Sequence, residues 1–138
     1  MAVELGWLDT NIFIHALSAP DSHYARCTDL INALQDGRAE GWINATVLHE
    51  LSYVLSRRRD FAMRTTIATY LLEILNAPGV LAAEKAILIA TVTRWGTTTI
   101  AFVDAYLTEL TQRDGLPVCT VNARDFPGIA NAYATAVM

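Results

Sequence analysis

The chain of 138 residues contains only two cysteines and one lysine. Cys27 and Cys119 lie far apart and form no CxxC pair, so neither a disulfide framework nor a zinc knuckle is expected. Two isolated thiols of this kind suit a reducing, cytoplasmic location. The three histidines show no HExxH motif and no histidine–carboxylate spacing, which argues against a zinc enzyme.

Long uninterrupted hydrophobic runs are also missing. Glu4 and Asp9 interrupt the first apolar segment, and no basic region precedes it, so no signal peptide is expected. The most apolar stretch, residues 67–92, contains Glu73, Pro78 and other breaks, whereas a membrane span needs about 20 apolar residues. We therefore expect no membrane association.

The composition is that of one globular domain. Hydrophobic residues make up 53% of the chain and charged residues 17%, which is enough apolar material for a core and argues against disorder. The net charge is −4, from 10 basic and 14 acidic residues, so the overall field does not favour nucleic acid. This sum is a weak guide if several acids gather in one place.

Short apolar segments alternate with amphipathic ones along the whole chain. The pattern predicts an α/β sandwich with a central, mostly parallel sheet. The predicted strands are residues 3–9, 40–45, 80–83 and 116–121, with a final edge strand within residues 129–138. The predicted helices are residues 10–17, 24–36, 47–59, 60–75, 84–95 and 97–114.

Polar residues and glycines mark the expected helix ends. Asp21 or Ser22 is expected to cap the second helix, and Thr46 the third. Asp60 is expected to open the fourth helix, and Gly96 to close the fifth.

Five acidic or amide residues fall where the elements of such a fold end or begin. Asp9 ends the first strand, Glu50 and Asp104 lie in early helical turns, and Asn122 and Asp125 follow the last long strand. Ligands bind outside the carboxyl ends of the strands in open α/β sheets. These residues are therefore expected to converge on one edge.

Convergence would demand a positive counter-charge, because carboxylates within a few ångströms repel one another. Lys85 is the only lysine, and it is distant from all of them in sequence. Oxygen ligands select Mg²⁺ or Mn²⁺. Such an ion activates water and stabilises a phosphoryl oxygen, which is the chemistry of phosphodiester hydrolysis.

Each residue also has an ordinary structural interpretation. Asp9 can cap the following helix, and so can its neighbour Asn11. Glu50 and Asp104 are favoured by the helix macrodipole, and Asp125 can be a turn residue. Only their joint occurrence at corresponding ends of elements favours a site.

Arginine supplies nine of the ten basic residues. Arg57, Arg58 and Arg59 end the third helix, where cations are favoured in any case. The alternative is contact with RNA phosphates, joined by Arg124, because arginine binds phosphate in bidentate fashion.

Four segments resemble, in order and spacing, the sequence blocks of PIN-domain nucleases, most closely the VapC-type toxins of type II toxin–antitoxin modules. These segments are LDTNIFI, ATVLHELSYVL, IAFVDAYLTEL and CTVNARDF, and the resemblance spans residues 5–127. It implies a single PIN domain over residues 1–138 with a Rossmann-like α/β/α fold. It also implies a Mg²⁺- or Mn²⁺-dependent endoribonuclease acting on structured RNA such as tRNA or rRNA, a homodimer, and inhibition by a small antitoxin protein.

Carried over by position, the resemblance makes Asp9, Glu50 and Asp104 the first three catalytic and metal-binding acids, with Asn11 in support. It also places a partner-facing apolar surface on the helices around residues 25–34 and 63–74.

The fourth acidic position departs from the family pattern. Many members have an aspartate two residues after the threonine that ends the last long strand, whereas here Thr120 is followed by Val121 and Asn122. We expect Asp125 to supply the fourth carboxylate, with Thr120 and Asn122 supporting it.

The toxin assignment has three alternatives. An RNA-processing nuclease and a non-catalytic RNA- or protein-binding module both keep the same fold. A phosphoacceptor receiver domain is disfavoured, because no aspartate follows the second or third strand and no lysine follows residues 116–121.

Overall fold

The computed structural model describes residues 1–132, and strands and helices alternate through this range as predicted. The strands are β1 (Val3–Trp7), β2 (Ala39–Trp42), β3 (Val80–Leu81), β4 (Val118–Thr120) and β5 (Ala130–Ala132). The helices are α1 (Thr10–His15), α2 (Tyr24–Asp36), α3 (Ala45–Ser56), α4 (Arg64–Asn76), α5 (Lys85–Thr97) and α6 (Phe102–Asp114), with 3-10 turns η1 (Arg59–Phe61) and η2 (Ala123–Asp125). The predicted α/β class is confirmed.

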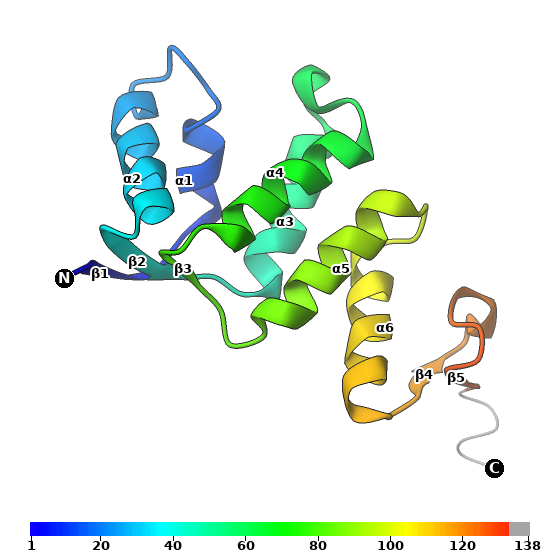
Figure 1. The fold of residues 1–138 in the computed structure, drawn as a ribbon. Helices are drawn as coiled ribbons and strands as arrows, with labels where there is room; N and C mark the ends of the chain where they lie inside the picture. Colours follow the sequence, from blue (N-terminus) through cyan, green and yellow to red (C-terminus); the bar gives the residue numbers. More distant parts are fainter. Residues whose placement is uncertain (133–138) are drawn as a thin grey trace.

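All paired strands run parallel, which the alternation of strands and helices also predicts. They are divided between two sheets in the range 1–132: β1, β2 and β3 form one in that order, and β4 and β5 form the other. Figure 1 shows the first sheet beside the N-terminus and the β4–β5 sheet at the opposite end of the molecule, beyond α5 and α6.

The core lies between the helices and the three-stranded sheet. Its largest fully buried side chains come from α1 to α5 and from β3 and its neighbours. They are Phe13, Leu34, Ile43, Leu48, Leu51, Leu55, Ile67, Leu71, Leu75, Leu88, Val80 and Val92. The most buried apolar side chains of α2 and α4 are part of this core. The partner-facing surface expected around residues 25–34 and 63–74 stays a prediction, and it would consist of the other side chains of these helices.

The helix starts differ from the predictions by one or a few residues. Asn44, not Thr46, caps α3: its Oδ1 accepts the Val47 N–H at 3.2 Å. The Asp21 carboxylate accepts the His23 N–H at 2.8 Å, but His23 itself occupies the N-cap position of α2. Asp60 lies in η1.

Gly96 does not close α5 but lies inside it, because the helix continues to Thr97. A Cβ at Gly96 would lie 2.4 Å from the Ala68 Cβ of α4, so this glycine lets α4 and α5 approach closely. The predicted final edge strand is confirmed in β5, and the rest of that segment, residues 133–138, lies outside the described range.

No helix within residues 1–132 is long and apolar enough to cross a membrane.

Candidate active site

Asp9 lies two residues after the end of β1 and occupies the N-cap position of α1. Its side chain accepts no hydrogen bond from the α1 backbone, so the capping role considered above is not realised. The Asn11 Nδ2 donates to the Asp9 Oδ2 at 3.4 Å, and Thr10 is buried between them. Asp9 is therefore an exposed carboxylate at the carboxyl end of a strand, oriented by its neighbour Asn11.

Glu50 and Asp104 lie on two helices that contact each other. Glu50 is exposed in the second turn of α3, so the macrodipole that acts on a first turn does not explain it. Asp104 is half-buried in the first turn of α6. The residues beside them, His49 and Phe102, stack with ring centroids 5.4 Å apart and planes at 3°, which joins α3 to α6.

The last predicted members lie in the loop after β4. The Thr120 Oγ1 accepts the Asn122 N–H at 2.9 Å, and the Asp125 N–H donates to the Asn122 carbonyl oxygen at 3.0 Å. Residues 121–125 line an open hollow of about 530 Å³. Thr120 thus holds the start of the loop that carries Asn122 and Asp125, and this loop makes no contact with the other predicted acids.

The oxygen donors suit Mg²⁺ chemically, but their arrangement does not form a metal site. Within residues 1–132, no three histidine, cysteine or acidic side chains lie close enough together to hold a metal ion. Asp9, Glu50, Asp104 and Asp125 also form no salt bridge with any residue of that range. They are thus four carboxylates without a protein cation, held on separate elements.

The comparison with known families decides the fold family. A family model described as PIN domain matches residues 7–126, which is most of the chain. The chain belongs to the PIN domain family. This is a family of generally metal-dependent nucleases that act on RNA. No curated protein and no solved structure matches the chain.

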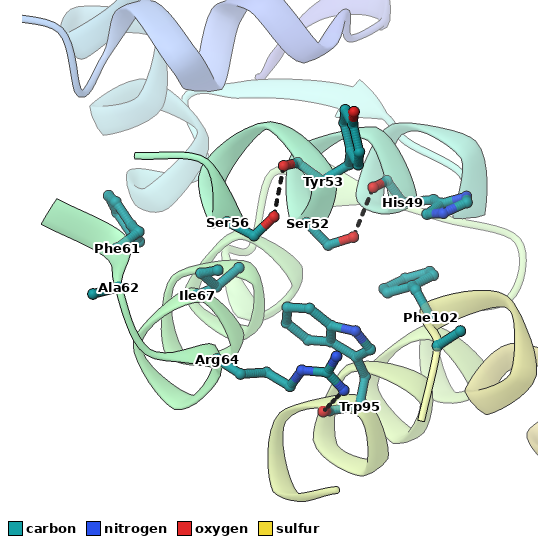
Figure 2. Close-up of a pocket in the computed structure, with 11 residues that line it drawn as sticks. His49, Ser52, Tyr53, Ser56, Phe61, Ala62, Arg64, Ile67, Trp95 and Phe102 are labelled. Atoms are coloured by element: carbon teal, nitrogen blue, oxygen red, sulfur yellow. Dashed lines mark hydrogen bonds between the residues drawn. The ribbon is translucent and has the colours of Figure 1, made fainter. Parts of the chain in front are cut away.

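A second pocket of this PIN domain lies beside the α3–α6 contact (Figure 2). It is open, has a volume of about 380 Å³, and is bounded by α3, η1, α4, α5 and the start of α6. In Figure 2 the Arg64 side chain lies along Trp95, and its guanidinium carbon is 4.6 Å from the Trp95 ring centroid. The Arg64 Nη1 also donates to the carbonyl oxygens of Trp95, Thr98 and Ile100. This arginine therefore holds the α5–α6 connection and is not a free ligand-binding cation.

The predicted RNA-binding arginines of the PIN domain differ in how far the protein itself uses them. Arg58 donates to the Ser18 hydroxyl, to the Leu17 carbonyl and to both Asp60 oxygens, and this carboxylate raises the pKa of Arg58. Arg57 donates to the Tyr53 hydroxyl at 2.6 Å and stacks over that ring. Arg58 is therefore a structural residue first.

Arg59 and Arg124 are exposed and form no salt bridge within residues 1–132. They remain the candidates for phosphate contact. Tyr53 was missed in the sequence, although its spacing of four residues from Arg57 on one helix was a usable signal. Phe102 and Trp95 were also missed, because their role depends on contacts between helices.

Proposed function

We propose that this PIN domain is a Mg²⁺- or Mn²⁺-dependent endoribonuclease that hydrolyses structured RNA such as tRNA or rRNA. We further propose that it acts in the cytoplasm as the toxin of a type II toxin–antitoxin module, as a homodimer inhibited by a cognate antitoxin protein. Its family supports nuclease chemistry, and the four VapC-like sequence segments support the toxin assignment. Asp9, Glu50, Asp104 and Asp125 are the proposed catalytic and metal-binding residues.

One observation carries the proposal: Asp9 keeps an unused carboxylate at the end of β1. A carboxylate at a helix N-terminus usually accepts a backbone N–H, and Asp9 does not. Asn11 instead orients it from the side. Glu50, in a second turn, also lacks an ordinary helix-terminal role. Hard divalent cations prefer such all-oxygen donor sets, so these residues are suited to Mg²⁺ or Mn²⁺.

Cleavage assays with matched variants test the proposal. Wild-type protein is incubated with total RNA in Mg²⁺, in Mn²⁺ and in EDTA, and the new RNA ends are sequenced. We expect cleavage at defined positions that requires the metal. Asp9→Asn and Asp104→Asn should reduce cleavage at least about 100-fold, because each removes a charged ligand. Asp29→Asn, at an exposed acid on α2, is the matched control and should cleave normally.

Cleavage retained in both Asp9→Asn and Asp104→Asn, with circular dichroism showing folded proteins, would contradict the assignment of the site. RNA binding that needs no metal and leads to no cleavage would favour the non-catalytic module. The presence of Asn122 at a position that is often acidic in the family also favours that alternative. An RNA-processing nuclease would cleave precursor RNAs without arresting growth. The toxin assignment predicts growth arrest on induced expression of the wild type, but not of Asp9→Asn.

A further inference from the structure

The β1 strand lies at one edge of the three-stranded sheet and is exposed along its whole length. All five of its residues are exposed, including Val3 at 62%, Leu5 at 37% and Trp7 at 71%. Trp7 pairs in register with Trp42 of β2, which is itself 41% exposed, and their ring centroids are 6.2 Å apart. Parallel strands are normally buried on both faces. An apolar, exposed parallel strand therefore indicates that part of the sheet is missing.

The β4–β5 sheet has the complementary deficiency. Its two strands are parallel, and two strands alone are marginal in water. Leu116 just before β4 is 66% exposed, Val121 just after it is 79% exposed, and Cys119 within it is exposed. If β4 lay beside β1, the strands would form one parallel sheet in the order 3-2-1-4-5. In this order the chain adds strands in one direction from β1 to β3 and in the other from β4 to β5. Open α/β sheets bind ligands at the point where that direction changes, here between β1 and β4.

The same chain cannot close this gap while α6 stays in place. The Arg94 Nε donates to the Glu109 Oε1 at 2.7 Å, which ties the middle of α6 to α5. At the end of α6, Arg113 contacts Glu84, which lies directly before α5 and three residues after the end of β3. The end of α6 is thus held on the β3 side of the sheet, across from the free edge of β1. Figure 1 shows α6 and β1 on opposite sides of the molecule.

The connection from α6 to β4 has no spare length for crossing that distance. Residues 115–117 make four Cα–Cα steps between Asp114 and Val118, which span at most about 14 Å when fully extended. Passing from β3 to a position beyond β1 takes three strand spacings, about 14 Å, before any shift along the strands. Short connections of this kind favour exchange of an element between copies.

We propose that two copies of this chain exchange their β4–β5 units, residues 118–132, so that β4 of one copy pairs with β1 of the other. The proposal that the resulting site is catalytic rests on the nuclease function proposed above, whereas the exchange itself does not. Asp9, Glu50 and Asp104 of one copy would then share a crevice with Asn122 and Asp125 of the second copy. This explains why residues 1–132 of a single copy do not assemble the metal site.

Cysteine cross-linking tests the exchange without relying on activity. Val3→Cys, Leu5→Cys and Trp7→Cys place a thiol at three successive positions along β1. The position that lies opposite Cys119 of a neighbouring β4 comes within disulfide reach of it. Cys27 is only 6% exposed and does not compete. We expect at least one variant to form a covalent dimer on mild oxidation, and added Cys119→Ser to abolish it. A disulfide within one chain, or none in all three variants, would overturn the proposal.

Mixed dimers test whether the site is shared. Asp9→Asn and Asp125→Asn are each expected to be inactive alone. In an exchanged heterodimer, one site carries both substitutions and the other carries none. With random pairing, half of the dimers are mixed and half of their sites are intact, so co-expression should restore about one quarter of wild-type cleavage. A mixture that stays inactive beside an active wild type would refute the exchange. An inactive wild type would instead refute the proposed function, and the cross-links would still decide the assembly.

Discussion

The contact between Gly96 and Ala68 permits a prediction whose sign depends on which of two opposing effects is larger. Alanine at position 96 would favour the helical state by about 1 kcal/mol, because glycine is a poor residue in a helix interior. The added Cβ would however lie 2.4 Å from the Ala68 Cβ, well inside van der Waals contact. Both atoms are attached directly to helix backbones, so no flexible side chain can move away.

We expect the steric effect to dominate. Overpacking in a core typically costs about 1–3 kcal/mol, and this contact is more severe than one extra methylene in a tolerant site. Gly96→Ala should therefore lower the free energy of unfolding by about 1–2 kcal/mol after the gain in helix propensity is subtracted. For a chain of 138 residues that corresponds to a decrease in Tm of roughly 3–7 °C.

Urea unfolding of four proteins measures the effect: wild type, Gly96→Ala, Ala68→Gly and the double variant. The double variant moves one methyl group from α4 to α5, so positions 68 and 96 again hold one alanine and one glycine. Its free energy of unfolding should therefore lie within about 1 kcal/mol of the wild-type value. If Gly96→Ala is instead more stable than wild type, and the two changes are additive, α4 and α5 do not approach as closely as the structure shows.

Three further predictions concern polar groups. Arg94→Ala should lower the free energy of unfolding by about 2 kcal/mol, because it leaves Glu109, which is only 8% exposed, without its cation. Glu109→Ala should lower it by less, because the remaining Arg94 side chain can turn to water. Chemical unfolding of both variants measures the difference. Arg64→Lys should cost about 1–2 kcal/mol, because lysine cannot stack and donate in the same geometry; its Tm checks this. Burial raises the pKa of both Tyr70 and Tyr106 to about 12. Their neutral forms therefore favour folding, and this contribution to stability is lost as the pH rises from about 10 through 12. In Tyr→Phe variants the free energy of unfolding should fall less over that pH range than in the wild type.

Local sequence signals determined most element positions. The helical spacing of apolar residues predicted α2 and its end before Gly37, whose φ of 75° suits glycine. The errors are at caps and glycines that have more than one use. Asn44 and Thr46 are both good capping residues, and only backbone geometry at α3 selects Asn44. The sequence predicts Gly96 as a helix end, because its close contact with Ala68 appears only when α4 packs on α5.

For the candidate site, the sequence by itself determined which residues carry the chemistry: acids placed after β1 and β4 and in early turns of α3 and α6. Their types and order suffice for that, because a parallel fold sends strand ends to one edge. Only the tertiary structure decided whether they meet. Arg94 and Arg113 fix α6 to α5, and the three residues after α6 are too few to return β4 to β1. Such distances depend on contacts far apart in the chain, which no local pattern of residues records.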